Sequence, residues 1–363
     1  MVQFASALII GLFSPSSIVW AHPGHDVEAE AAKRAAFLSS LPVESRSLTA
    51  CSPKLKARGI ENINVVRRGS TVQQLRRDMG LDTGSRYLKA RDINSVLATD
   101  HHSSLTNVGP STDPKVLFRS QGASIAQPEV TQGPYYISGE LVRRNVVEDQ
   151  QGVPLFMDIQ LIDTNTCNPL PNVYTDIWHC NATGVYSGVV AKGNGNVKDE
   201  NNANTTFLRG VQPSDENGVV HFQTIFPGHY FHRAIHIHLA THPVHETTVL
   251  PNGTIAGMYD SRSSHVGQIF FDQDLISEVE KIAPYSSNTQ PLTPNVRDRI
   301  LAAEADSTDP LMEYVLLGDK IRDGIFAWMT IGIDGKRDGL LTPHSYWTEE
   351  GGKLNNRFRY HGD

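Results

Sequence analysis

The stretch PGHYFHRAIHIHLATH, residues 227–242, holds five of the fifteen histidines of this 363-residue chain. Within it, RAIHIHLA alternates in the manner of a β-strand, so His236 and His238 should project from one face and the intervening isoleucines from the other. Two imidazoles side by side on a rigid strand form half of a metal site. Four further potential ligands, His229, Tyr230, His232 and His242, lie within seven residues of the pair, which favours metal binding over simple packing.

Strand-like segments separated by turn signals such as NP, NG and GNGN surround this stretch. Short strands with such spacing are typical of an all-β sandwich. The predicted strands cover residues 154–163, 172–180, 218–226, 234–242 and 265–272, followed by a hairpin of EYVLLGD and IFAWMTIGIDGK. We therefore expect an all-β, immunoglobulin- or transthyretin-like β-sandwich as the core of the protein.

Helical segments are predicted before and after the sandwich. Residues 25–41 are rich in strong helix formers, and within 46–91 the stretch STVQQLRRDMG has Ser70 as a candidate cap and Gly80 as a stop. After the strands, DLISEVEKIAPY and TPNVRDRILAAEAD predict two short helices, the second capped by Thr293. Pro294 would then occupy its first helical position.

This pattern divides the chain into four parts. They are a signal peptide (1–21), an N-terminal helical segment and linker (22–127), the catalytic β-sandwich (128–345) and a C-terminal tail (346–363). Residues 92–127 are rich in Ser, Asn, Thr, Asp and Pro, which predicts an irregular linker that wraps around the β-rich part.

Composition and charge exclude several partners. Hydrophobic residues make up 39% of the chain, which supplies a sizeable core. The formal net charge is -7, and the basic residues form no long run. We therefore expect no nucleic-acid or anionic-membrane partner.

The N-terminus predicts secretion. MVQFASALIIGLFSPSSIVWAH has an apolar run over residues 4–13 that is too short to span a bilayer and is followed by small residues before a cleavage point near His22. Acceptor triplets for N-glycosylation at Asn181, Asn204 and Asn252 agree with this. We expect a soluble extracellular protein.

The three cysteines are Cys51, Cys167 and Cys180. In an oxidising compartment Cys167 and Cys180 could pair across neighbouring strands. That hypothesis leaves Cys51 free or paired with another molecule.

Two tyrosines extend the histidine pair to a donor set. Tyr230 lies six residues before His236, and Tyr186 lies in the loop NATGVYSG after a predicted strand. Phenolate is a hard anionic donor, so two tyrosines with two histidines indicate ferric iron, Fe(III), rather than zinc or ferrous iron. Two phenolates and a hydroxide also neutralise a +3 ion, which lowers the cost of burying it.

The runs DIWHCNATGVYSG, FLRGVQPSDENGVVHFQTIFPGHYFHRAIHIHLATH and HVGQIFFD resemble the intradiol ring-cleavage dioxygenases, in particular their secreted catechol-dioxygenase-like branch. The resemblance implies that Tyr186, Tyr230, His236 and His238 hold Fe(III). It also implies that the protein uses O2 to cleave an ortho-diphenol between its two hydroxylated carbons, giving a muconate-type dicarboxylic acid.

The resemblance assigns further roles. Tyr230 and His236 would be axial ligands, Tyr186 and His238 equatorial ones, and a displaced Tyr230 would take a substrate proton. Arg233 matches the arginine that stabilises the anionic substrate.

Gln268 in HVGQIFFD resembles the family's active-site glutamine, at a longer spacing after the histidine pair. The segment TQGPYYISGELVR matches the loop that lines the substrate pocket through Gly133, Pro134 and Tyr135. This chain has Gln132 where the family has glutamate, and Tyr136 is a rival ligand that we interpret as core packing.

Two alternatives stay open at the level of sequence. One is an Fe(II) cupin dioxygenase, for which Glu246 and His265 could complete the histidine pair. The other is a non-catalytic β-sandwich that binds polyphenol or iron through the same ligands. The N-terminal helices also suggest a homodimer.

Overall fold

The structure is a computed structural model. It describes residues 48–84, 118, 123–125, 133–194, 196, 198–242, 247–255, 262–263, 265–305, 309–336, 339–348 and 351–355, with residues 32 and 36. The predicted signal peptide, the helix over residues 25–41, most of the wrap over residues 92–127, and Gln132 lie outside the described residues.

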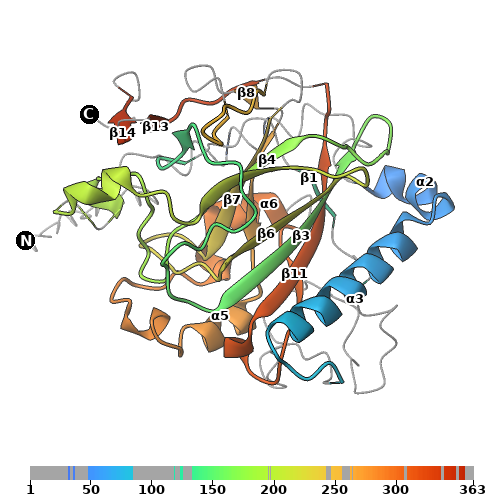
Figure 1. Ribbon diagram of the computed structural model, residues 1–363, viewed down its shortest axis with the longest axis horizontal. Coiled ribbons are helices and arrows are strands. Elements are labelled where there is room, and N and C mark those ends of the chain that lie inside the picture. The colour runs from blue at the N-terminus through green and yellow to red at the C-terminus, as the bar shows by residue number, and fades with distance from the viewer. Residues whose placement is uncertain are drawn as a thin grey trace, which may run out of the picture.

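Two β-sheets face each other and form the body of the molecule (Figure 1). The five-stranded sheet has the order β1-β11-β3-β6, with β10 paired to β11, and the four-stranded sheet has the order β5-β4-β7-β9. Their bounds are β1 Ala123–Ile125, β3 Pro154–Asp163, β6 Val219–Ile225, β10 Glu313–Leu316 and β11 Ile325–Ile333, then β4 Tyr174–Trp178, β5 Arg209–Pro213, β7 His236–His242 and β9 His265–Phe270. The prediction of an all-β core with flanking helices is confirmed.

The main core lies between the sheets because strand side chains alternate between two faces. Leu155, Met157 and Ile159 of β3 point into it from one sheet, and Ile237 and Leu239 of β7 from the other. Each such buried side chain contributes about 1.5–3 kcal/mol relative to leaving it exposed. The isoleucines of the opening stretch are thus core residues, and its two strand histidines lie on the outer face of the four-stranded sheet.

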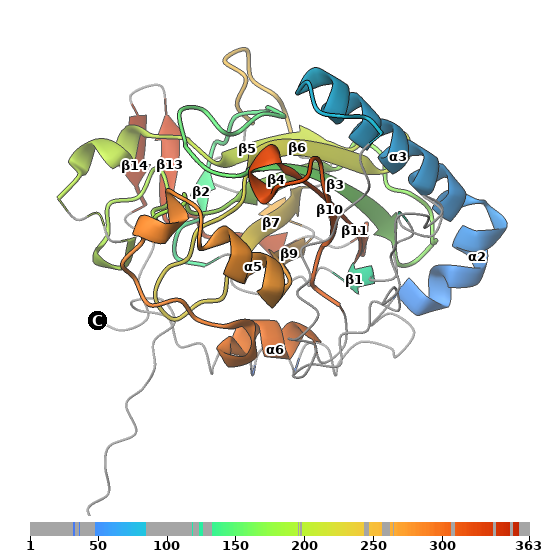
Figure 2. The same cartoon turned by 90° about the horizontal axis from the view of Figure 1, so that it is seen from below.

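Helices flank the two sheets (Figure 2). The long helix α3 (Ile60–Asp78), preceded by η2 (Leu48–Cys51) and α2 (Ser52–Ala57), lies along the five-stranded sheet, while α5 (Gln273–Val279) and α6 (Arg299–Ala305) lie on the opposite side. Val65 and Val72 of α3 pack on Phe156, Phe326 and Trp328 of the sheet. The predicted helix after β9 is confirmed as α5.

Short strands and turns complete the fold around the outer face of the four-stranded sheet. β2 (Ile137–Ser138), β13 (Ser345–Thr348) and β14 (Gly351–Leu354) form a small sheet, and β8 (Arg262–Ser263) pairs with β12 (Gly339–Leu340). The 3-10 turns are η3 Lys192–Asn194, η4 Glu200–Asn204, η6 Tyr285–Ser287, η7 Asn295–Arg297 and η8 Ile321–Asp323.

Two predicted helix starts are wrong. Helix α3 begins after Gly59, whose φ of 67° is left-handed, and it runs through Ser70, although Gly80 follows its end as predicted. Pro294 is extended, with ψ of 151°, and precedes only the turn η7. The side chain that bonds the first turn of α6 is Asp298, whose Oδ1 accepts the Leu301 backbone N–H at 2.9 Å.

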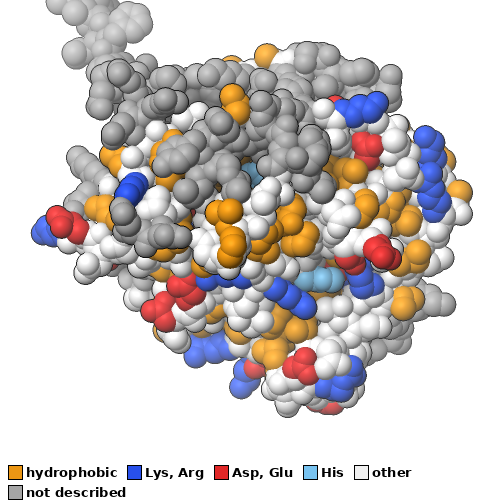
Figure 3. Space-filling view, turned by 45° about the horizontal axis from the view of Figure 1, so that its top comes forward, with side chains coloured by type: hydrophobic (Ala, Val, Ile, Leu, Met, Phe, Trp, Pro, Cys, Tyr) orange, Lys and Arg blue, Asp and Glu red, His pale blue; other side chains and the backbone are white. Residues whose placement is uncertain are grey.

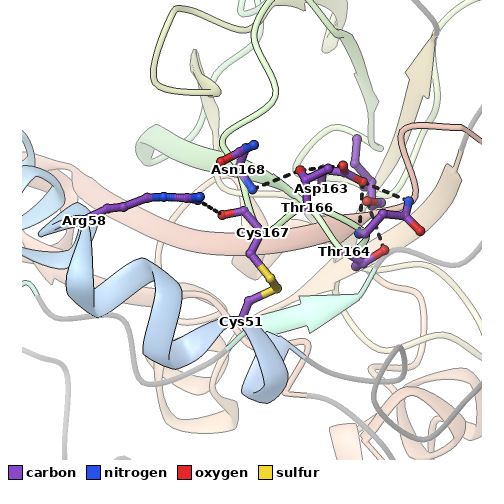
Figure 4. Close-up of a disulfide and its surroundings, with 9 residues drawn as sticks. Cys51, Arg58, Asp163, Thr164, Thr166, Cys167 and Asn168 are labelled. Carbon is purple, nitrogen blue, oxygen red and sulfur yellow. Dashed lines mark hydrogen bonds between the residues drawn. A yellow bond between two sulfur atoms is a disulfide. The ribbon is translucent and has the colours of Figure 1, made fainter.

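The predicted disulfide is also wrong. Cys167 pairs with Cys51, 116 residues away (Figure 4). Cys180 is buried, and its thiol lies 3.2 Å from the Gly228 carbonyl oxygen, to which it donates. The expectation failed because β3 and β4, which precede the two cysteines, lie in different sheets. Closing so long a loop stabilises the fold by about 4–5 kcal/mol on the chain-entropy estimate.

The described surface carries mixed charges. On the face drawn in Figure 3, basic and acidic side chains are interspersed rather than gathered by sign. None of the helices in the described ranges combines the length and apolar character needed to cross a bilayer.

Candidate metal centre

Strand register places four side chains in one row on the outer face of the four-stranded sheet. His238 lies directly opposite Trp178 of β4 and Gln268 of β9, and Trp178 lies opposite Arg209 of β5. Directly opposed residues of antiparallel strands share a face. The Trp178 indole stacks on the His238 imidazole, with ring centroids 5.0 Å apart and planes 3° apart. The tryptophan therefore fixes the orientation of one predicted ligand.

Three predicted ligand atoms meet beside this row. Tyr230 Oη lies 3.1 Å from His236 Nε2, which lies 3.1 Å from His238 Nε2. His236 Nδ1 is 2.7 Å from the Ala234 carbonyl oxygen. A carbonyl only accepts, so Nδ1 carries the proton and the neutral ring presents its Nε2 lone pair to the site. A ring N–H bonded to a carbonyl is the usual support of a metal-binding histidine.

Tyr186 completes the set. Its ring centroid lies 5.6 Å from that of Tyr230 and 6.0 Å from that of His238. Among the described residues its buried hydroxyl makes no hydrogen bond of ordinary geometry, although it lies close enough to Tyr230 for each phenol to shift the pKa of the other. Leaving a buried hydroxyl unsatisfied costs about 1–3 kcal/mol. A trivalent cation held by two phenols and two imidazoles would satisfy it, so these residues fit ferric iron.

Burial sets the protonation of these groups. It raises the pKa of Tyr186 well above that of an ordinary phenol, with the nearby Tyr230 adding to the shift, and it also raises the pKa of Tyr230. Burial, followed by the neighbouring His236, lowers the pKa of His238. The apolar surroundings thus hold phenols and imidazole neutral. A bound cation reverses this balance for the phenols, because it favours their anionic form.

The backbone of Tyr186 is held by buried asparagines that the sequence analysis did not single out. Asn194 accepts the Tyr186 N–H at 2.7 Å and donates to its carbonyl at 2.8 Å, and Asn202 donates to the same carbonyl at 2.8 Å. Asn196 donates to the carbonyl of Val189, three residues further on. The sequence analysis took GNGN only as a turn signal, and the asparagines clustered between residues 194 and 204, so close to Tyr186, were the available signal.

Arg233 and Gln268 come together beside the histidines. Both are buried, and Arg233 Nη2 donates to Gln268 Oε1. Arg233 Nε also donates to Asp298 Oδ2 at 2.8 Å. Arg233 is therefore not a surface residue, and Gln268 lies next to it despite its longer spacing in the sequence. The sequence around Asp298 contains no motif that predicts its contact with Arg233.

The pocket loop lies against the same centre. Gly133, Pro134 and Tyr135 are buried, and the Tyr135 ring centroid is 4.8 Å from that of Tyr186. The Tyr136 ring instead packs on Trp178 at 5.0 Å. The structure therefore places Tyr135 beside the ligands and Tyr136 in the packing behind them.

Replacing Gly133 with alanine is expected to disturb His238. Gly133 has a φ of 73°, and a Cβ there would lie 3.0 Å from His238 Cε1. We expect about tenfold weaker iron retention, the scale of a disturbed supporting contact around a metal ligand. Iron content after chelator challenge measures this effect.

Gly253→Ala is the matched control for that variant. Gly253 has a similar φ of 82°, with nothing within 4 Å of an added Cβ. It carries the same backbone strain without the histidine contact. Equal iron retention in the two variants would show that the Gly133 contact is irrelevant to the metal.

The cupin alternative is not supported by the described contacts. His265 Nε2 accepts the Asp334 backbone N–H at 3.0 Å, and Glu246 lies outside the described residues. No group of three or more His, Cys, Asp or Glu suited to a metal ion is found within the described ranges. His236 and His238 instead lie beside the phenol rings of Tyr230 and Tyr186.

Comparisons with known proteins identify the family of this chain. Residues 131–248 match a family model described as Dioxygenase. An intradiol ring-cleavage dioxygenase from Tetranychus urticae is 30% identical over 59% of this chain and 96% of its own, with a TM-score of 0.46. No curated protein sequence matches the chain. The chain belongs to the intradiol ring-cleavage dioxygenase family.

Solved structures with lower identity are also similar. The dioxygenase domain of a dioxygenase carbohydrate-binding protein fusion from Streptomyces sp. SirexAA-E is 21% identical over 58% of this chain and 98% of its own, with a TM-score of 0.36. Catechol 1,2-dioxygenase from Acinetobacter sp. ADP1 is 21% identical over 59% of this chain and 62% of its own, with a TM-score of 0.34.

Proposed function

We propose that this protein is a secreted Fe(III) dioxygenase that cleaves catechol-type rings between the two hydroxylated carbons, giving muconate-type dicarboxylic acids. The observation that carries the proposal is the meeting of Tyr230 Oη, His236 Nε2 and His238 Nε2 beside the buried Tyr186 side chain. When bound, ferric iron would draw electron density from a coordinated diphenol and so open its ring to attack by O2.

The chain's own residues supply proton transfer and charge stabilisation. Tyr230, as a phenolate, would accept a substrate hydroxyl proton, and its hydroxyl already bonds His236 Nε2. The buried Arg233 guanidinium would stabilise the negative charge that the diphenol acquires as it loses its protons. Gly133, Pro134 and Tyr135 would form the wall against which the aromatic ring lies.

The test combines an iron assay with spectra, oxygen uptake and product mass. Ferric tyrosinate should colour the protein red to brown, and catechol added without air should shift that absorption. Admitting air should then consume O2 and release a ring-opened acid. A coloured protein that binds catechol but releases no such acid would instead be a polyphenol- or iron-binding module. A colourless protein that takes up no iron would contradict both the enzyme and the iron-binding module.

Secretion is a separate part of the proposal, supported by the disulfide between Cys51 and Cys167, which is typical of oxidising compartments. Of the acceptor asparagines, Asn252 is exposed, whereas Asn181 Nδ2 donates to Gln150 Oε1 at 3.1 Å. The glycan attaches to Nδ2. We therefore expect the secreted protein to carry a glycan on Asn252 and none on Asn181.

Glycopeptide mass spectrometry measures this, and Asn252→Gln should remove the glycan. A secreted protein with a bare Asn252, or with a modified Asn181, would contradict the expectation. The homodimer stays a prediction, which sedimentation of the intact protein measures.

A further inference from the structure

The segment between α5 and α6, residues 280–298, runs beside the loop that carries Tyr230 and Arg233. Asn288 Nδ2 donates to the carbonyl of His229 at 2.7 Å, and the carbonyl of Gln290 lies 2.8 Å from His229 Nε2. The segment therefore holds the loop through both the backbone and the side chain of one residue. It lies beyond residues 131–248, the part that matches the family model.

Asp298 ends this segment and contacts the loop at Arg233. Its Oδ2 accepts the Arg233 Nε–H at 2.8 Å and the Ala234 backbone N–H at 2.7 Å. Its Oδ1 accepts the Leu301 backbone N–H at 2.9 Å, in the first turn of α6. One buried carboxylate thus joins the start of a helix to the arginine beside the metal centre.

We propose that Asp298 is the positioning residue for Arg233. This inference rests on the proposed function, in which Arg233 stabilises the anionic substrate. An arginine side chain has many rotamers, and a charge-assisted bond at Nε fixes the plane of its guanidinium group. With Nε held by Asp298, Nη2 reaches Gln268, which lies opposite His238 in the sheet. The carboxylate also compensates the buried positive charge.

Asp298→Asn tests the proposal because it keeps the shape of the side chain and removes its charge. We expect normal iron content, since the hydrogen bonds of Asp298 described above go to Arg233, Ala234 and Leu301, and its charge acts on the proposed ligand Tyr230 without a described hydrogen bond. Turnover of catechol should fall about 10- to 100-fold, the scale of lost outer-shell support, mainly in kcat. Asp215→Asn is the control: Asp215 is exposed, and its Oδ1 likewise accepts two backbone N–H groups.

A double-mutant cycle separates positioning from a general effect on folding. If Asp298 acts through Arg233, then Asp298→Asn should reduce kcat no further in an Arg233→Gln background. Effects that multiply in the double variant would overturn the proposal. So would full kcat in the single Asp298→Asn variant of a wild-type protein that cleaves catechol.

A measurement on the iron-free protein keeps this test independent of the proposed activity. In 15N NMR spectra, the Arg233 Nε–H signal can be assigned by its loss in Arg233→Gln. We expect that proton to exchange slowly with water, and Asp298→Asn to accelerate its exchange at least about tenfold, as for a lost buried hydrogen bond. Unchanged exchange would overturn the inference. An inactive wild-type protein with accelerated exchange in the variant would refute only the proposed function.

Discussion

Replacing His238 with alanine is expected to remove iron from the protein and to lower ring-cleaving turnover at least about 100-fold. Loss of outer-shell support alone costs about 10- to 100-fold in affinity or activity, and His238 is a proposed ligand itself. Its Nε2 lies 3.1 Å from His236 Nε2, so its removal takes away one of the converging donors. Iron per chain and oxygen uptake with catechol measure the two effects.

Stability must be followed in the same variant. His238 is buried and stacks on Trp178, so truncation also leaves a cavity. His221→Ala is the control for iron content and turnover, because His221 lies on β6 of the other sheet and is partly exposed; its stability is measured separately, since His221 Nε2 lies 3.1 Å from Asp158 Oδ2. If folded His238→Ala kept the iron content and turnover of the wild type, the assignment of His238 as a ligand would be wrong.

Replacing Asp158 with alanine is expected to lower the free energy of unfolding by about 3–5 kcal/mol, the usual cost of removing one partner of a buried ion pair. Asp158 is fully buried on β3. It accepts two bonds from Arg67, at 2.8 and 2.9 Å, and one from the buried Arg68 at 3.2 Å. Both arginines lie on α3, so the carboxylate fastens the N-terminal helix to the sheet. Without it, Arg68 would be a buried charge that has lost its carboxylate partner.

Denaturant unfolding measures this loss. Asp149→Ala is the control, because Asp149 is an exposed carboxylate whose Oδ1 accepts only from the adjacent Gln150 side chain. An unchanged midpoint for Asp158→Ala would show that α3 is held by its apolar contacts alone.

The same carboxylate makes stability depend on pH. Burial opposes ionisation of Asp158, but bonds from His221 and Arg67 and the charge of Arg68 outweigh it and hold its pKa well below the ordinary value. The stabilisation is therefore fully present above the unfolded pKa of about 3.9, and it is lost as pH falls toward the folded pKa. The stability difference between the wild type and Asp158→Ala, measured from unfolding curves, should narrow as pH falls from about 5 to about 3 but not vanish, because the folded pKa lies below this range. An unchanged difference would contradict this.

Local sequence predicted most of the strands and indicated a donor set, which stays a proposal. Alternation over residues 234–242 placed His236 and His238 on one face, and the core confirms this through Ile237 and Leu239. Residue chemistry alone indicated ferric iron, because two phenols beside two imidazoles suit a hard trivalent cation. Such inferences succeed where the interacting residues are close in the chain, since periodicity fixes which way neighbouring side chains point.

Tertiary structure decided the partners that lie far apart in the chain. Cys51 and Cys167 are 116 residues apart, and Asp298 is 65 residues from Arg233. The row that places Arg209 and Trp178 beside the histidines follows from the pairing register of four strands. Register and sheet membership depend on the packing of the whole molecule, because a strand's own alternation says which face a side chain is on and not which strand lies beside it.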